Sequence, residues 1–292
     1  MISLRASTML VLLMLPAAAA AQTTTTPPDQ TGTQPPAQPA VQTAPEHSDP
    51  DVRVDPLQPD FNLAALPTTL RLPAHKLSFR VTHRFTRSVG EGDFGDLLSN
   101  FFTFDSAAQI GLELRYGLMP GTQIGIHRTS DKSIELFGQH NFLKERDGRP
   151  IGLDAIVTFE GEDNLHRHHQ GAFGLVASRF VGKRAALYVE PIFVANSNDT
   201  VSGADNSTAM IGLGARVRIR PATYLMAEFT PRVAGFDPGT DQVSFGLEER
   251  VGGHLFQINV SNGFGTTLGQ LARGGVSRDS WYIGFNIARK FF

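Results

Sequence analysis

The chain has 292 residues, of which 41% are hydrophobic and 18% are charged, and its formal net charge is −2. An ordinary soluble protein carries roughly 25% charged residues, so this chain is poor in charge, and its near-neutral balance argues against a nucleic-acid partner. Cysteine is absent, which excludes disulfide bonds and cysteine-ligated metal sites.

Residues 1–21 have the three parts of a secretory signal peptide. The start MISLR is positively charged, MLVLLML is a short apolar core, and PAAAAAQ provides small residues at a cleavage point. A membrane-spanning helix needs roughly 20 apolar residues, far more than this run contains. We therefore expect the chain to be exported and cleaved before Gln22.

Residues 22–66 are expected to form a disordered tether. The segment is rich in proline, threonine and glutamine, and such a composition buries too little apolar surface to offset the entropy of ordering a chain. A solvated spacer is the simpler interpretation, and a contact with the cell wall or a partner is the alternative. Residues 67–292 are then expected to form a β-barrel domain.

From Lys76 onward, apolar and polar side chains alternate in segments such as KLSFRVTHRF and AAQIGLELRYG. These segments have about ten residues, which is the length of a tilted membrane-spanning strand, and we count about twelve of them.

Arginine at Leu213, on the apolar face, is expected to disturb folding far more than alanine at Arg216. The other side chains expected to contact lipid are Ile110, Leu112, Ile124, Ile211, Val217, Phe245, Ile258, Ile283 and Phe285.

Loop lengths distinguish a membrane barrel from a soluble β-sandwich, whose strands alternate in the same way. Short connections such as LMPG and VGKR take turns with long ones such as NSNDTVSGADNS. A barrel with one periplasmic and one external rim produces this order. The sequence therefore predicts an all-β protein, an antiparallel up-and-down transmembrane β-barrel of about 12 strands with short periplasmic turns and long external loops.

The last strand of this pattern, SWYIGFNIARKFF, continues to the final residue. It resembles the C-terminal signature by which the barrel-assembly machinery recognises bacterial outer-membrane proteins. This resemblance implies that the machinery is a partner during insertion. The residues expected to form the assembly signal are Trp281, Ile283, Phe285, Ile287, Phe291 and Phe292.

Three longer runs resemble an uncharacterised family of bacterial outer-membrane β-barrel proteins: LRLPAHKLSFRVTHRFTR, FDSAAQIGLELRYGLMPGTQIGIHRT and the ending FQINVSNGFG…SRDSWYIGFNIARKFF. The resemblance covers residues 68–292. It implies a porin-like barrel in the outer membrane of a Gram-negative bacterium, surrounded by lipid and lipopolysaccharide. It brings no substrate and no functional residue.

The polar faces of the predicted strands carry charges that would line the lumen. Arg216, Arg218 and Arg220 occur at every second position and form a row on one face of a strand. This arginine row has two interpretations: a strip that attracts anions, or a network of salt bridges that makes the barrel rigid. The candidates for selectivity are Arg216, Arg218, Arg220, Arg80, Arg84 and Arg115. The candidate acidic partners are Glu113, Glu190, Glu228 and Glu248.

A three-residue turn at residues 220–222 sets the register of the arginine row. It pairs Arg218 with Tyr224 and Arg216 with Met226, which places Glu228 diagonal to Arg216. Arg216 is then expected to be neutralised within its own hairpin. Arg218 and Arg220 stay available to anions, so a conducting barrel should weakly prefer anions.

The run GDLLSNFFTF in the first long loop has apolar residues at helical spacing. It predicts a short helix that forms a lid over the barrel mouth, with an extension of the second strand as the alternative. The glycine-rich run GFGTTLG lacks the lysine of a phosphate-binding loop and is interpreted as a plain loop. The residues of the expected lid are Leu97, Leu98, Phe101 and Phe102.

No catalytic constellation, metal site or cofactor is expected. The histidines of NLHRHH are interpreted as part of a solvated loop, since no cysteine and no well-placed carboxylate accompanies them. The leading function is a porin-like conduit for small, weakly anion-preferred solutes. The alternatives are a non-conducting structural or assembly barrel with a lumen filled by side chains, and a receptor or adhesive barrel acting through its external loops.

Overall fold

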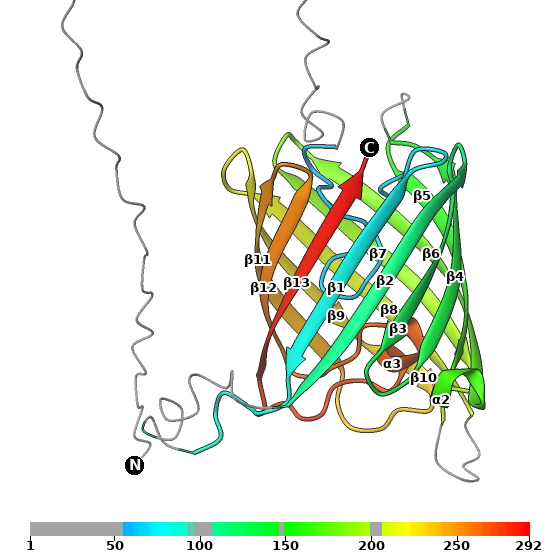
Figure 1. Ribbon diagram of the computed structural model, residues 1–292, viewed down its shortest axis with the longest axis vertical. Helices are drawn as coiled ribbons and strands as arrows, with labels where there is room; N and C mark the ends of the chain where they lie inside the picture. Colours follow the sequence, from blue (N-terminus) through cyan, green and yellow to red (C-terminus); the bar gives the residue numbers. More distant parts are fainter. Residues whose placement is uncertain (1–54, 93–94, 96–106, 146–148, 199–205) are drawn as a thin grey trace, which may run out of the picture. The chain divides into compact units, whose positions relative to one another are not determined.

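The structure is a computed structural model that describes residues 55–92, 95, 107–145, 149–198 and 206–292. These residues form a barrel of antiparallel strands (Figure 1). No helix in this part of the chain is long and apolar enough to cross a bilayer.

Within the described ranges, the strands follow one another along the chain and two short helices lie between them. The strands are β1 (Leu77–Phe85), β2 (Ala108–Met119), β3 (Thr122–Thr129), β4 (Ile134–Leu143), β5 (Gly152–Gly161), β6 (Arg167–Val181), β7 (Ala185–Ala195), β8 (Ser207–Arg218), β9 (Thr223–Thr230), β10 (Arg232–Gly235), β11 (Gln242–Val251), β12 (His254–Ser261) and β13 (Tyr282–Phe291). The helices are α2 (Glu162–Leu165) and α3 (Leu268–Ala272).

The barrel closes where the first strand meets the last. β1 pairs with β13 from Leu77↔Phe291 to Arg84↔Gly284, and β9 pairs with both β8 and β11. Twelve strands therefore form a ring, while β10 pairs with β8 and lies outside it. Closure pairs the backbone groups of every strand, as hydrocarbon requires. The predicted twelve-stranded antiparallel barrel is confirmed.

The two rims of the barrel differ. The turns β2–β3, β6–β7, β8–β9 and β11–β12 lie at the end where the chain leaves β13, at the top of Figure 1. The helices α2 and α3 and strand β10 lie at the opposite end. Since short turns are periplasmic in such barrels, we call the first end the periplasmic rim and the second the external rim.

The outer face of the barrel is apolar, as the alternation predicts. Ile110, Leu112, Ile124, Val217, Phe245 and Ile258 are exposed there, and Ile211, Ile283 and Phe285 are half-buried on the same face. The inner face is polar and buried, with glutamate, glutamine, serine and arginine side chains on nearly every strand.

Arginine at Leu213 is expected to destabilise the barrel by about 2–4 kcal/mol, the cost of such a charge near mid-membrane. Leu213 is 39% exposed on the outer face and lies between Val189 and Phe229 of the neighbouring strands. Arginine at Val251, next to a rim turn, is the matched control and should cost only about 0–1 kcal/mol. Urea unfolding in lipid vesicles measures both, and equal effects would contradict the orientation of the barrel in the membrane.

Candidate functional site

A segment before the first strand fills the barrel lumen. We call residues 57–72 the plug; most of them are buried, and the segment is drawn in blue inside the ring of strands in Figure 1. The expected boundary of the disordered tether at residue 66 is wrong, because residues 57–66 are buried. The apolar residues Leu63 and Leu66 belong to one buried cluster with wall residues such as Val176 and Tyr188.

The plug is a tight loop whose tip points into the lumen. The Leu63 N–H donates to the Leu66 carbonyl at 2.8 Å, and the Thr68 N–H donates to the Phe61 carbonyl at 2.7 Å. The Thr68 hydroxyl also donates to the Asp60 carbonyl at 2.8 Å. These bonds hold the two arms of the loop together and leave the groups at its tip free to contact the wall.

One carboxylate of the wall binds the tip of the plug. Glu228 of β9 accepts hydrogen bonds at Oε2 from the backbone N–H groups of Ala64 (3.1 Å), Ala65 (3.0 Å) and Leu66 (3.1 Å). Hydrogen bonds between N–H groups and a carboxylate are charge-assisted and stronger than bonds between neutral groups. Glu228 therefore anchors the plug to one side of the lumen.

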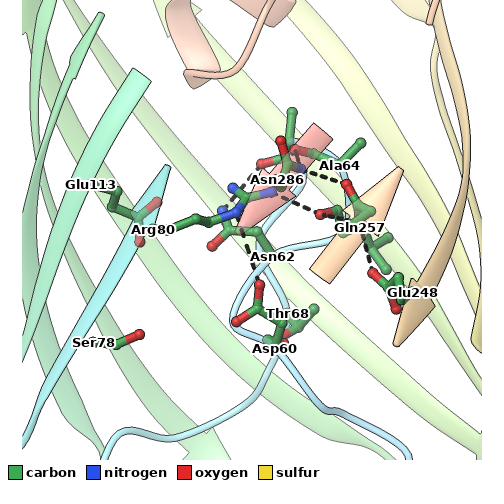
Figure 2. Close-up of polar contacts among 12 residues, drawn as sticks. Asp60, Asn62, Ala64, Thr68, Ser78, Arg80, Glu113, Glu248, Gln257 and Asn286 are labelled. Carbon is green, nitrogen blue, oxygen red and sulfur yellow. Dashed lines mark hydrogen bonds and ion pairs between the residues drawn. The ribbon is translucent and has the colours of Figure 1, made fainter. Parts of the chain in front are cut away.

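The lumen wall formed by β1 and β13 is cationic and binds the acceptors of the plug (Figure 2). Arg80 of β1 donates to the carbonyls of Leu63 (2.9 Å) and Ala64 (2.7 Å). Asp60 lies 3.3 Å from Lys290 Nζ and 3.9 Å from Arg80 Nε. Burial alone would raise the pKa of the Asp60 carboxyl, but Lys290, Arg80 and then Arg216 outweigh burial and leave it below its ordinary value.

Arg216 is held by a buried ion pair. Its guanidinium donates to Glu248 at 2.7 and 2.9 Å and to the Asn62 carbonyl at 2.8 Å. The expected register is confirmed, since Arg216 pairs with Met226 and Arg218 with Tyr224. The expected neutralisation by Glu228 is wrong, because the plug occupies that carboxylate.

The remaining candidates of the lumen are divided between the wall and the rim. Arg115 pairs with Glu113 at 3.0 Å and lies over the Phe137 ring. Arg84 donates to Asn286 at 2.8 Å. Arg218 is half-buried and Arg220 is exposed, both at the periplasmic rim. Glu190 is fully buried on β7, and neither of its carboxylate oxygens has a hydrogen-bond partner among the described residues.

The external side of the lumen is covered by the connection between β12 and β13. Its helix α3 is buried along its whole length, Thr267 accepts from the Gln270 N–H at 3.2 Å, and the Leu268 N–H donates to Glu135 at 3.1 Å. The run GFGTTLG is a loop up to Thr267, as interpreted from the sequence, and its last two residues begin α3. The predicted lid residues Leu97, Leu98, Phe101 and Phe102 lie outside the described residues.

The plug and α3 share one apolar cluster and leave little space between them. Leu63 and Leu66 of the plug belong to the same buried cluster as Leu268 and Leu271. The cavity that separates the two segments has a volume of about 20 Å³, which is room for about one water molecule. A second cavity of about 420 Å³ lies between the ends of the plug and the wall, lined by residues such as Arg71 and Lys144.

The C-terminal residues lie as their alternation predicts. Ile283, Phe285 and Ile287 are half-buried on the outer face, Phe291 is exposed there, and Trp281 and Phe292 flank β13. Their role as an assembly signal stays a prediction. Among the residues described, no group of three or more histidine, aspartate or glutamate side chains is placed to hold a metal ion.

These features define a membrane-spanning β-barrel whose lumen is closed by its own N-terminal segment. Residues 60–291 match the family described as membrane bound beta barrel domain (DUF5777), and the chain belongs to this family. The match begins at Asp60, so it includes nearly all of the plug.

Structural comparison matches the chain to several solved barrels. The NanC porin is 11% identical, with a TM-score of 0.49 over 74% of this chain and 99% of that one. The KdgM porin in complex with disordered oligogalacturonate is 7% identical, with a TM-score of 0.47 over 74% and 99%. The outer membrane protein Omp33 of Acinetobacter baumannii is 9% identical, with a TM-score of 0.41 over 74% and 98%. None of the curated proteins matches the chain.

Proposed function

We propose that the chain is a porin-like conduit of the outer membrane, closed at rest by the plug. The observation that carries this proposal is the non-covalent attachment of the plug to two parts of the lumen wall, by Glu228 of β9 and by Arg80 of β1 and Lys290 of β13. Transport rather than catalysis is the role proposed. We also propose that lipid and lipopolysaccharide surround the barrel and that the barrel-assembly machinery recognises β13.

The charged lumen wall supports a conduit that opens. Burying an ion pair such as Arg216–Glu248 costs desolvation that well-packed apolar side chains would avoid. The side chain of the buried Glu190 has no hydrogen-bond partner among the described residues, and a buried polar group without a partner costs further free energy. When the plug leaves and water enters, these wall side chains are hydrated again, and the desolvation cost is removed.

The expected weak anion preference is part of this proposal. Removal of the plug would expose Arg80 and Lys290 in addition to Arg218 and Arg220 at the rim. Fixed charges in a low-dielectric wall steer ions more strongly than the net charge of the protein does. Replacing Arg218 and Arg220 together with glutamate should abolish or invert the preference.

A barrel that stays closed is the second candidate. The filled lumen and the cavity of only about 20 Å³ between the plug and α3 favour it. The strand number does not decide between the two candidates. Barrels of about eight strands are filled by side chains, barrels of sixteen or more leave a channel, and twelve strands is an intermediate size.

A disulfide between the plug and the wall separates the two candidates. The Thr69 and Ser178 hydroxyl oxygens are 2.7 Å apart, so cysteines there can reach the Cβ separation of about 3.5–4.5 Å that a disulfide needs. The chain contains no other cysteine. We expect the reduced double variant to show conductance steps in planar bilayers and the oxidised one to lose most of them.

The matched control joins two wall strands and leaves the plug free. The Ser244 and Ser261 hydroxyls of β11 and β12 are 3.1 Å apart, and a cysteine pair there should leave conductance unchanged on oxidation. If neither the natural chain nor the reduced Thr69–Ser178 variant conducts at any voltage, the closed barrel is the better description.

A further inference from the structure

The lumen wall binds the plug mainly through the plug's main chain. Backbone groups are common to all peptides, so these contacts depend little on the sequence of the plug. The carbonyl bonds are Arg216 to Asn62 (2.8 Å), Arg80 and Gln257 to Leu63 (2.9 and 3.3 Å), Arg80, Asn286 and Arg84 to Ala64 (2.7, 3.2 and 3.4 Å), Gln139 to Thr68 (2.7 Å) and Gln123 to Leu70 (3.2 Å). Figure 2 shows Arg80, Gln257 and Asn286 gathered around Ala64.

The wall also binds backbone donors. Glu228 accepts from three successive N–H groups, and Gln123 both accepts from the Leu72 N–H at 3.2 Å and donates to the Leu70 carbonyl. A side chain that accepts from one backbone N–H and donates to a nearby backbone carbonyl needs a donor and an acceptor at a fixed spacing. It therefore recognises the peptide group itself. A sugar or a simple anion has no row of three successive N–H groups.

Two hollows in the wall receive aliphatic side chains of the plug. A Cβ atom on Gly212 would lie 2.8 Å from Leu66 Cδ2, and one on Gly214 would clash with Leu63 Cδ1. The absence of side chains at these positions of β8 therefore leaves room for leucines three residues apart. The wall thus provides backbone partners, an aliphatic site and, at Lys290 and Arg80, a site for a carboxylate.

We infer that the open lumen binds short peptides that carry an acidic residue and aliphatic side chains, and that the plug occupies this site at rest as a built-in competitor. The inference rests on the proposed function, since the plug must leave before a solute can take its place. The groups that hold the plug are fixed on the strands, so they face the same space after the plug has left. A peptide can satisfy all of them together.

A tethered plug competes strongly with a free peptide, because a short linker gives an effective concentration on the order of mM. The test therefore uses the full chain with a weakened plug and an unchanged wall. Proline at both Ala64 and Ala65 removes two of the N–H groups that bind Glu228. Asp60→Asn with Asn62→Ala weakens the plug through other contacts, and heat-modifiable mobility shows which variant is folded.

The probes are fluorescent peptides added to the solubilised variants, with binding measured by anisotropy. The first has the sequence of residues 60–69, DFNLAALPTT, and the second is the same peptide N-methylated at the positions of residues 64–66. We expect the second to bind about tenfold more weakly or worse, because bonds to a charged acceptor are lost. Valine at Gly214, which fills one hollow, should weaken the first peptide by about tenfold as well.

The same measurement includes a trimer of glucuronic acid as a competitor. Equal binding of the N-methylated peptide, or displacement by the trimer at lower concentration than by unlabelled peptide, would show that the lumen selects charge and would overturn the inference. Absence of peptide binding to either folded variant would also overturn it. Conductance is recorded separately. If the barrel conducts but binds no peptide, the proposed function stands and the peptide site does not. If it binds peptide but does not conduct, the peptide site stands in a closed barrel.

Discussion

Alanine at Arg216 is expected to destabilise the folded barrel by about 3–5 kcal/mol, because it leaves the carboxylate of Glu248 buried without its cation. Both side chains of the pair are fully buried, and Arg216 also donates to the Asn62 carbonyl of the plug. From the sequence alone, this substitution is expected to be mild compared with arginine at Leu213. The structure changes that expectation, since the plug excludes the water that would have solvated Glu248.

Three further variants check the origin of the effect. Glu248→Ala should be similarly damaging, and Arg216→Met combined with Glu248→Leu should recover most of the loss, because no charge is then left unpaired. Arg218→Ala is the control on the same face of β8: Arg218 is half-buried, and the change should stay within about 0.5 kcal/mol. Urea unfolding measures all four, and a small effect of Arg216→Ala would show that water reaches Glu248 in the folded barrel.

Alanine at Glu228 is expected to release the plug while the barrel stays folded. Each hydrogen bond to a charged acceptor contributes about 1.5–3 kcal/mol, and Glu228 accepts three from Ala64, Ala65 and Leu66. We expect docking of the plug to weaken by at least about 3 kcal/mol, which raises the population of the undocked state about a hundredfold.

A single cysteine at Ala65 reports on this release. Ala65 is buried at the tip of the plug, and the natural chain has no cysteine, so a polar thiol reagent reaches the site only when the plug is undocked. Labelling should accelerate about a hundredfold with Glu228→Ala and less with Glu228→Gln, which keeps an acceptor oxygen. Unchanged labelling in both would mean that the cationic side of the lumen holds the plug without help from Glu228.

The faces and the closure of the barrel could be predicted because they depend on neighbours along the chain. Alternation with period two assigns each side chain to one face, and this placed Ile258 outside and Glu248 inside as the structure has them. Turn length sets the register of a hairpin, which paired Arg216 with Met226 as observed. The final strand had to pair with the first, because hydrocarbon does not tolerate an open edge.

The contents of the lumen could not be predicted in the same way. The plug has a short apolar run, FNLAALP, directly after the proline-rich segment, and this run was the available signal. Composition averaged over residues 22–66 concealed it. The helix α3 was concealed for a similar reason, since a glycine-rich stretch precedes Leu268 and the helix has only five residues.

The sequence by itself determined a membrane barrel of about twelve strands with an apolar outer face and a charged inner face, because these properties follow from local periodicity. Only the tertiary structure decided that the plug fills the lumen and which charged side chains of the wall bind it. Ala64 and Glu228 are 164 positions apart in the chain, and Asp60 meets Lys290 near the opposite end. Such contacts exist only after the ring has closed and brought the walls around the plug, so no pattern within a strand encodes them.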